Sequence, residues 1–139
     1  MDYSQFIREV PDFPRPGILF KDITPLLQNG PIYKQAISDL CNPFKGERID
    51  QVVAIEARGY LLGAPMAVEL EAGLIPVRKQ GKLPFETVQA KYTLEYGESV
   101  IEIHRDSLIS QDRVIVVDDV LATGGTLAAT IELIEGLGA

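Results

Sequence analysis

The feature that most constrains the fold is the stretch VIVVDDVLATGGT at residues 114–126. Four aliphatic residues follow one another without a polar side chain, a pattern typical of a strand that is covered on both faces. These residues lead directly into two aspartates and a loop of small residues. The apolar spacing of residues 126–139, TLAATIELIEGLGA, then predicts a helix. The stretch therefore predicts the strand–loop–helix unit of an α/β protein.

The rest of the chain alternates in the same way between predicted strands and helices. Residues 51–55 (QVVAI), 74–79 (LIPVRK) and 99–104 (SVIEIH) predict strands. Residues 60–73 (YLLGAPMAVELEAG) predict a helix that ends near Gly73. This order predicts an α/β fold with a mostly parallel sheet flanked by helices.

Three segments have less regular patterns. Residues 1–10 predict a short helix that Pro11 ends. Residues 80–97, QGKLPFETVQAKYTLEYG, predict a long loop with only short extended pieces, and such a loop in a compact domain is usually functional or mobile. The last predicted helix ends in glycines, which usually lead back into another strand, whereas the sequence stops at Ala139. We therefore expect a chain that is short at its C-terminal end.

Length and composition fit one compact domain over residues 1–139, since 46% of the residues are hydrophobic. The formal net charge of -7 argues against a nucleic-acid surface, which normally needs a basic patch, but allows a local cationic pocket for a small anion. The single cysteine, Cys41, cannot form an intramolecular disulfide. No segment approaches the ~20 apolar residues that span a bilayer, and the N-terminus lacks a signal pattern. We therefore expect a soluble cytoplasmic protein with no membrane partner.

The two aspartates lie where α/β sheets bind ligands, at the carboxyl end of a strand. Adjacent carboxylates at Asp118 and Asp119 suit a pair of sugar hydroxyls or a nearby magnesium ion. The loop that follows offers backbone N–H groups, a helix N-terminus and the hydroxyls of Thr123 and Thr126, which together suit a phosphate. The alternative, that the aspartates cap the next helix or face solvent, is the weaker interpretation of the full run. The stretch therefore predicts a sugar-phosphate site. The sequence lacks the GxxxxGK[ST] motif of nucleoside triphosphatases, so that class of enzyme is not indicated.

The same stretch resembles the phosphoribosyl-diphosphate motif of the type I phosphoribosyltransferases. Four more segments, FPRPGILFKDITPLL, EARGYLLGAP, RKQGKLP and YTLEYG, are similar to those of the adenine phosphoribosyltransferases and occur in that family's order. The resemblance runs from about Phe13 to the end of the chain. It implies the type I fold with a flexible hood loop, and transfer of a 5-phosphoribosyl group from its 1-diphosphate to adenine, giving AMP and diphosphate. It also implies a homodimer, and Mg²⁺ held mainly through substrate and water rather than by metal ligands of the protein.

The resemblance assigns roles to individual residues. The ribose hydroxyls are assigned to Asp118 and Asp119. The 5-phosphate is assigned to the loop of Ala122, Thr123, Gly124, Gly125 and Thr126. The diphosphate is assigned to Ala57, Arg58, Gly59, Arg78, Lys79 and Lys82, and adenine to Leu19, Phe20 and Lys21.

Several of these assignments have a physical basis or an open point. Arg58 suits a diphosphate because its planar fork of donors matches the phosphate oxygens. Arg78 is implied to reach the partner subunit's site, and the division of roles between Arg78, Lys79 and Lys82 stays open. Lys21 stands where many relatives carry arginine, which leaves a main-chain role there rather than a side-chain role.

Proton transfer is assigned to Glu95, and Tyr96 beside it is implied to order the loop or touch the diphosphate. Adenine must lose its N9 proton as N9 bonds to C1 of the ribose, and a nearby carboxylate can accept or relay that proton, an effect worth typically ~10²–10⁴-fold. His104, the only histidine, has no nucleophile partner in its motif and is assigned no catalytic role. Three alternatives stay open: a non-catalytic regulator that binds phosphoribosyl diphosphate, a transferase for xanthine, hypoxanthine or orotate, and an inactive fragment.

Overall fold

The computed structural model describes residues 1–94 and 97–139. The chain divides into two compact units, an N-terminal unit, Met1–Pro43, and a C-terminal unit, Phe44–Ala139. That residues 1–139 form one domain stays a prediction. Within the described ranges, no helix is long and apolar enough to cross a membrane.

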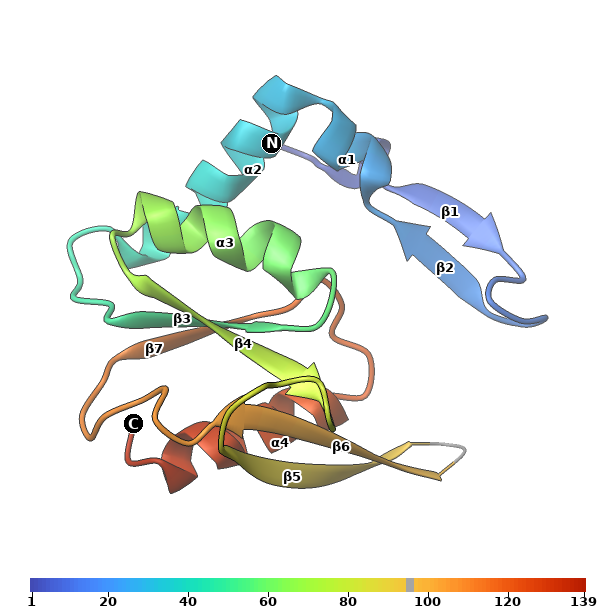
Figure 1. Cartoon of the computed structure of the whole chain (residues 1–139). Helices are drawn as coiled ribbons and strands as arrows, with labels where there is room; N and C mark the ends of the chain where they lie inside the picture. The colour runs from blue at the N-terminus through green and yellow to red at the C-terminus, as the bar shows by residue number, and fades with distance from the viewer. Residues whose placement is uncertain (95–96) are drawn as a thin grey trace. The chain divides into compact units, whose positions relative to one another are not determined.

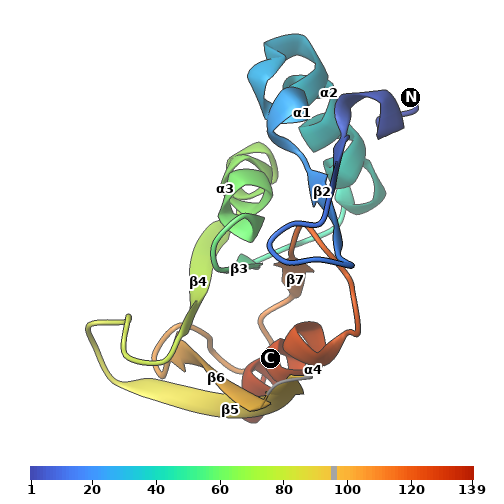
Figure 2. The same cartoon turned by 90° about the vertical axis from the view of Figure 1, so that its right-hand side faces the viewer.

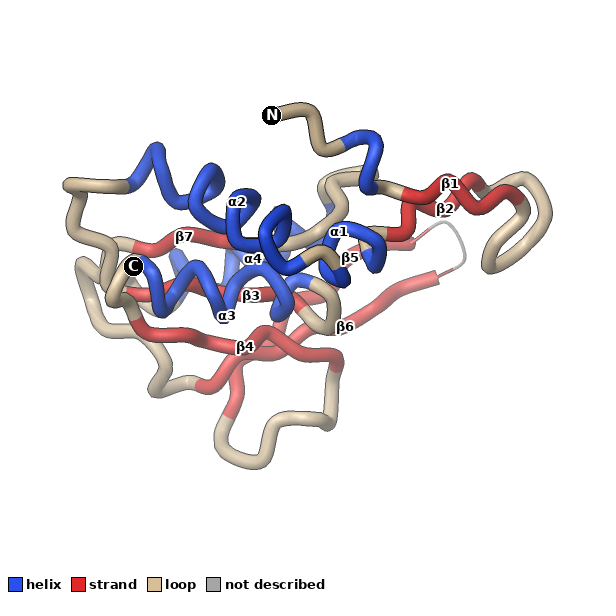
Figure 3. The backbone as a smooth tube through the Cα atoms, turned by 90° about the horizontal axis from the view of Figure 1, so that it is seen from above, coloured by secondary structure: helices blue, strands red, loops and turns tan. Residues whose placement is uncertain are grey.

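The C-terminal unit is built on a five-stranded sheet with the order β5-β6-β4-β3-β7. Its centre is parallel, because β3 (Gln51–Ile55) pairs with β4 (Gly73–Lys79) on one side and with β7 (Val114–Val117) on the other. Figure 3 shows these three strands side by side. The side chains of residues 52–54 are fully buried, as expected for an apolar strand that is covered on both faces.

Helices cover both faces of this sheet. Helix α3 (Gly59–Glu69) packs on β3 and β4, whereas α4 (Gly125–Gly136) packs mainly on β5 and β6 from the opposite face (Figure 1). Gly63 lies where α3 crosses β3, and a Cβ there would come within 2.6 Å of the Cβ of Ala54, so the close approach requires glycine. The predicted fold class, α/β with a sheet flanked by helices, is confirmed.

The prediction of a long loop over residues 80–97 is wrong for most of that segment. It contains strand β5 (Thr87–Leu94), which pairs antiparallel with β6 (Gly97–His104), and β6 continues the sheet by pairing antiparallel with the end of β4. Alternate residues of β5, at positions 88, 90 and 92, pack on the core, which is the period-two pattern of a strand. Figure 2 shows the sheet curling so that β5 and β6 lie against α4. The sheet is therefore a parallel centre extended by an antiparallel hairpin.

The apolar side chains of the curled sheet and of α4 form one core. Its members come from β3, β4, β5, β6 and α4, and they include Val53, Val77, Ile101, Ile103 and Leu133. Full burial of a side chain of this size contributes roughly 1.5–3 kcal/mol. This core fixes the strand register on which the positions of the candidate site residues depend.

The N-terminal unit begins with a short antiparallel sheet of β1 (Arg8–Pro11) and β2 (Leu19–Asp22). The helix predicted over residues 1–10 is limited to one 3-10 turn, η1 (Ser4–Phe6), because the chain then becomes extended and pairs with β2. The connection between the strands contains a cis peptide bond between Phe13 and Pro14.

Two helices and a turn complete the N-terminal unit: α1 (Thr24–Gln28), α2 (Gly30–Cys41) and the 3-10 turn η2 (Asn42–Phe44), which ends at the first residue of the C-terminal unit. Helix α2 begins at Gly30 because the side chain of Asn29 caps it, accepting a hydrogen bond from the backbone N–H of Ile32 at 3.3 Å.

Candidate active site

The register of the parallel strands brings three chain segments to one edge of the sheet. Ile55 at the end of β3 lies opposite Val77 of β4, and Ala54 lies opposite Val117 at the end of β7. The residues that follow β3 and β7, and those that end β4, are therefore neighbours although they are far apart in sequence. This is the carboxyl edge at which ligands bind in α/β sheets.

The two aspartates after β7 form a compact carboxylate pair. The backbone N–H of Asp119 donates a hydrogen bond to Oδ1 of Asp118 at 2.8 Å. Burial raises the pKa of Asp118 to about 6, and the charge of Asp119 acts in the same direction, whereas this backbone hydrogen bond and the Arg58 charge oppose the rise. Asp118 therefore titrates close to neutral pH.

Asp119 is the more enclosed of the two, and its side chain is only 5% exposed. Nε of Arg58 lies 2.9 Å from Oδ2 of Asp119, so the two side chains form an ion pair. The contact is close in distance, but no hydrogen bond of ordinary geometry reaches Oδ2 from the described residues. A buried carboxylate oxygen with unused acceptor capacity suits a ligand hydroxyl.

Gly59 allows α3 to approach the end of β7. A Cβ at this position would lie 2.9 Å from the carbonyl oxygen of Val117 and 3.3 Å from Oδ1 of Asp118. The glycine of the EARG segment therefore keeps the start of α3 close to the carboxylate pair after β7. The peptide bond between Glu56 and Ala57 in the same segment is cis.

The loop after Asp119 bounds a cavity of 360 Å³, whose walls are Val116, Asp118 and residues 120–127. Gly124 has a φ of +85°, a left-handed conformation that glycine adopts without strain, and α4 begins at the next residue. The hydroxyl of Thr123 accepts a hydrogen bond from the N–H of Gly125 at 3.4 Å. The predicted phosphate loop thus surrounds a real cavity at a helix N-terminus, where backbone N–H groups favour an anion.

A second cavity, of 160 Å³, adjoins the first. Its polar walls come from Glu56, Arg58, Arg78, Lys79, Asp118 and Asp119, and Ala57 also contributes. Asp118, Val120 and Thr126 line both cavities, so the carboxylate pair stands between a phosphate loop and a cluster of cations. The order loop, carboxylates, cations matches the order phosphate, ribose, diphosphate in a phosphoribosyl diphosphate.

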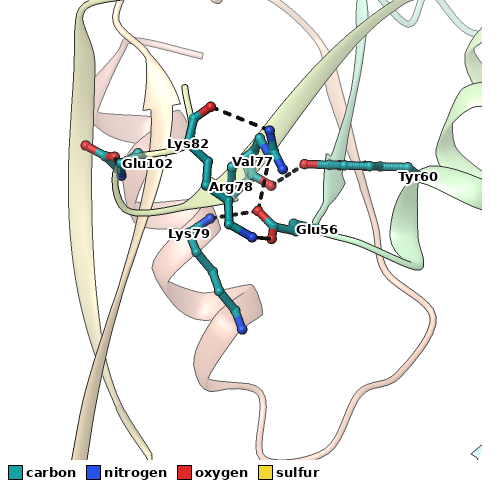
Figure 4. A network of polar contacts seen from close by, with 8 residues as sticks. Glu56, Tyr60, Val77, Arg78, Lys79, Lys82 and Glu102 are labelled. Carbon is teal, nitrogen blue, oxygen red and sulfur yellow. Dashed lines mark hydrogen bonds and ion pairs between the residues drawn. The ribbon is translucent and has the colours of Figure 1, made fainter. Parts of the chain in front are cut away.

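Lys82 joins the cationic cluster through Glu56. Its Nζ forms an ion pair with Oε2 of Glu56, while Nε of Arg78 lies 3.2 Å from Oε1 of the same carboxylate (Figure 4). The sequence interpretation did not single out Glu56: it is the first residue of the EARG segment, but the roles assigned in that segment began at Ala57. It also missed Tyr92 on β5, which lines the second cavity, since it assigned that segment to a loop.

The comparison with known proteins agrees with this arrangement. The family model of the phosphoribosyl transferase domain matches residues 26–139. The adenine phosphoribosyltransferase of Carboxydothermus hydrogenoformans is 53% identical over 139 residues, which cover all of this chain and 82% of that relative. The chain belongs to the adenine phosphoribosyltransferase family.

Solved structures of this family share the fold. The crystal structure of adenine phosphoribosyltransferase from Thermoanaerobacter pseudethanolicus has a TM-score of 0.93 and 50% identity, covering 96% of this chain and 78% of that one. The enzyme from Saccharomyces cerevisiae, in complex with an imino-altritol bisphosphate and adenine, has a TM-score of 0.92 and 40% identity, covering 99% of this chain and 82% of that one. The predicted membership of the type I phosphoribosyltransferases is therefore confirmed.

The residues that the family resemblance assigns to adenine lie on β2 of the N-terminal unit. Phe20 is half-buried, and its ring packs edge-on against that of Phe13 at a centroid distance of 5.1 Å. Leu19 is 51% exposed, and the ammonium of Lys21 forms an ion pair with Glu9. The pairing of Lys21 favours a main-chain role there, and the adenine assignment of all three residues stays a prediction.

Glu95 and Tyr96, the predicted catalytic residues of the phosphoribosyltransferase, lie outside the described residues, between the end of β5 and the start of β6. In the part of the chain that is described, no group of three or more His, Cys, Asp or Glu side chains could hold a metal ion. His104 accepts a hydrogen bond from the N–H of Phe85 at 3.3 Å, a contact that orders the start of the hairpin.

Proposed function

We propose that this chain transfers the 5-phosphoribosyl group of phosphoribosyl diphosphate to N9 of adenine, giving AMP and diphosphate in purine salvage. The observation that carries the proposal is the pair of adjoining cavities that share Asp118. One has the walls of a phosphate site and the other those of a diphosphate site, and the carboxylates between them suit the ribose diol. Membership of the adenine phosphoribosyltransferase family supports adenine as the acceptor.

In this proposal the substrate lies across the carboxyl edge of the sheet. Its 5-phosphate accepts hydrogen bonds from the backbone of residues 122–126, and its 2- and 3-hydroxyls donate to Asp118 and Asp119. The diphosphate faces Arg58 and Lys79. The unused acceptor capacity of buried Asp119 Oδ2 supports the assignment of a hydroxyl donor to that carboxylate.

The reaction forms a bond between N9 of adenine and C1 of the ribose as the bond from C1 to the diphosphate oxygen breaks. Positive charge develops on the sugar ring and negative charge on the leaving diphosphate, which the guanidinium and ammonium groups stabilise. The proton of adenine N9 passes to Glu95, directly or through a relay, and Tyr96 orders that segment or contacts the diphosphate. Leu19, Phe20 and Lys21 provide the adenine contacts, in which the backbone distinguishes an amino group from a carbonyl.

The carboxylates of the site fit a magnesium ion only in part, because Asp119 already pairs with Arg58 and the described residues hold no cluster of three ligands. We therefore propose that Mg²⁺ enters with the diphosphate and is bound mainly by substrate oxygens and water. When bound, it neutralises charge on the departing diphosphate. The single cysteine, Cys41, cannot form an intramolecular disulfide, which supports a reducing compartment, and we place the protein in the cytoplasm.

We further propose a homodimer in which Arg78 serves the partner subunit's site. A two-fold dimer allows each subunit to complete the other. The test mixes two inactive variants, Arg78→Ala and Glu95→Gln. If Glu95 acts in its own subunit's site, the hybrid dimer contains one site with both residues and should regain partial activity. A fully active monomer in light scattering would contradict the dimer, and a dimer without complementation would remove only the trans role of Arg78.

The proposed activity is tested by an assay of this chain for AMP formation from adenine, phosphoribosyl diphosphate and Mg²⁺. Xanthine, hypoxanthine and orotate serve as competing acceptors in parallel reactions. Adenine should be turned over at least about 10²-fold faster than a 6-oxopurine, because a mismatch leaves buried polar groups unpaired. Tight binding of phosphoribosyl diphosphate without turnover of any base would instead support a regulator.

A further inference from the structure

A buried carboxylate with no role assigned from the sequence, Glu56, contacts the cationic side of the site. We define the cationic arm as residues 78–82, which run from the end of β4 into the turn before β5 and carry Arg78, Lys79 and Lys82. Glu56 follows β3, and its side chain is 9% exposed. All of the acceptor contacts that its carboxylate makes within the described residues come from the cationic arm.

Both oxygens of Glu56 are used. Oε1 accepts from Nε of Arg78 at 3.2 Å and from the backbone N–H of Lys79 at 3.0 Å. Oε2 accepts from Nζ of Lys82. Burial alone raises the pKa of the Glu56 carboxyl, but the hydrogen bonds from Lys82, Lys79 and Arg78 outweigh burial and hold the pKa below its usual range. The carboxylate is therefore ionised and fixes two cations and a backbone amide at once.

The cationic arm is also held from its other side. Glu102 on β6 is 8% exposed and accepts from the N–H of Gly81 and from the hydroxyl of Thr87, both at 2.6 Å. Figure 4 shows Glu56 and Glu102 on opposite sides of the cationic arm. Two buried carboxylates from different strands therefore determine the course of this short segment.

The contacts leave positive charge available for a ligand. Of the three cations of the arm, Arg78 and Lys82 pair with the one carboxylate of Glu56, so the arm itself keeps an excess of positive charge. Figure 4 shows the side chain of Lys79 extending away from Glu56, and in the described residues no carboxylate pairs with its ammonium. Arg78 and Lys82 are 37% and 45% exposed, so both remain accessible to an anion while Glu56 holds them.

We propose that Glu56 is a positioning residue for the diphosphate, because its carboxylate sets the cationic arm in the conformation that places Arg78 and Lys79 at the wall of the second cavity and holds Lys82 beside them. The inference rests on the proposed function for the identity of the anion. Glu56 itself touches the cations and not the reacting atoms. Its effect on the ligand is thus indirect: it places the cations, and the strength of their interaction with the diphosphate depends on where they lie.

The test uses two ligands that differ in what they place near the cationic arm. Phosphoribosyl diphosphate carries the diphosphate, whereas AMP has the ribose phosphate but no diphosphate. Glu56→Gln keeps the shape and one acceptor but removes the charge, and it should weaken phosphoribosyl diphosphate binding about 5- to 20-fold in calorimetry, with AMP affinity changed less than about two-fold. The matched control is Glu69→Gln, which removes an acid on α3 that pairs with Lys45, and it should change neither affinity.

A double-mutant cycle tests whether Glu56 acts through Lys82. Lys82→Met should weaken phosphoribosyl diphosphate binding strongly in the parent and much less in the Glu56→Gln background, because Lys82 is already misplaced there. Additive effects would overturn the proposal. So would an equal loss of AMP and phosphoribosyl diphosphate affinity in Glu56→Gln, which indicates general damage, or tighter diphosphate binding, which makes Glu56 a competitor of the ligand.

A measurement without ligand separates this inference from the proposed function. In Glu56→Ala, hydrogen exchange should be faster for amides of residues 78–86 and unchanged for residues 114–127. Unchanged exchange in residues 78–86 would overturn the positioning role. If the parent bound neither ligand, the proposed function would fail, yet faster exchange in residues 78–86 would still support the control of the cationic arm by Glu56.

Discussion

The two sides of the candidate site are built in different ways. The side proposed to bind ribose and phosphate is continuous in sequence, since β7, the carboxylate pair and the predicted phosphate loop all lie within residues 114–126. The diphosphate side is assembled from residues that follow β3, end β4 and lie on β6, and Glu56 and Glu102 join them. One side depends on local geometry, whereas the other depends on the register of several strands.

This difference suggests a division of work. A preformed local cavity suits binding of the 5-phosphate and the ribose hydroxyls, which form and break no bond to carbon or phosphorus in the proposed reaction. The diphosphate side includes the hairpin of β5 and β6, and we call it the hairpin side. The cationic arm precedes this hairpin, and Glu95 lies between its two strands in the sequence. In the proposed reaction, the interactions of these groups change most as the diphosphate leaves. The comparison thus predicts that substitution of Glu95, between the strands of the hairpin, lowers kcat, whereas substitutions on the continuous side lower affinity.

The largest expected effect lies on the hairpin side. Glu95→Gln should lower kcat by ~10²–10⁴-fold, because the amide cannot accept the N9 proton. Binding of phosphoribosyl diphosphate should change far less, which single-turnover kinetics and calorimetry together can measure. Glu98→Gln is the matched control, since Glu98 is an exposed acid on β6 of the same hairpin. A parent-like single-turnover rate in Glu95→Gln would remove Glu95 from proton transfer.

On the continuous side, Asp119→Asn should weaken the binding of AMP and of phosphoribosyl diphosphate by about 10- to 100-fold. The expected loss is that of a charge-assisted hydrogen bond, roughly 1.5–3 kcal/mol. The same loss is expected for both ligands because both carry the ribose diol. Asp106→Asn, at an exposed position, removes the same formal charge and should leave affinity unchanged. Equal affinities in Asp119→Asn and the parent would contradict the ribose assignment.

Gly59 lies where the two sides meet, so Gly59→Ala should affect both. Its Cβ would lie 2.9 Å from the Val117 carbonyl oxygen and force the end of β7 to shift. Overpacking of this kind costs about 1–3 kcal/mol, which corresponds to a fall in Tm of about 3–10 °C by calorimetry. Gly136→Ala, near the end of α4, meets nothing within 4 Å and serves as the control for the gain in helix propensity. A Tm equal to that of the control would show that the close approach at Gly59 is dispensable.

The same contrast explains what the sequence could predict. The strand, loop and helix start of the continuous side were predicted, because an apolar strand, adjacent carboxylates and a glycine loop have local signatures at residues 114–126, and the ligand roles of these residues stay predictions. The cationic residues of the other side came from a family resemblance, and the carboxylates that hold them, Glu56 and Glu102, were missed. Their role depends on contacts with residues 78–87, which only the folded sheet creates.

The error over residues 80–97 has a physical cause as well. In β5 the apolar residues Val88, Ala90 and Tyr92 alternate with polar ones and face the core against α4. Glycine and proline residues lie near this strand, and the segment as a whole is polar. The prediction therefore followed the loop-like composition and overlooked the alternation of apolar and polar residues within residues 87–94. A strand at the edge of a sheet needs only one apolar face, so its composition alone is a poor guide.

The smallest expected effect concerns the pH dependence of stability on the continuous side. Burial first, with help from the Asp119 charge, raises the pKa of Asp118 from 3.8 to about 6 in the folded protein. Because the folded pKa is the higher one, the folded state holds the proton more tightly than the unfolded chain does. The stabilising contribution of the protonated group is fully present below about pH 3.8 and is lost as the pH rises through about 6.

Asp118→Asn removes this ionisation and keeps an oxygen that can accept from the N–H of Asp119. Without ligand, the variant should therefore have a higher Tm than the parent at pH 7 and above, and the difference should shrink as the pH falls from 6 to 4. Scanning calorimetry over that range measures it, and Asp106→Asn should show no such trend because its carboxylate is exposed. A Tm difference that does not vary with pH would mean that Asp118 is not destabilised by burial. The predicted combination, a more stable variant that binds AMP more weakly, would identify Asp118 as a carboxylate kept for binding at a cost to stability.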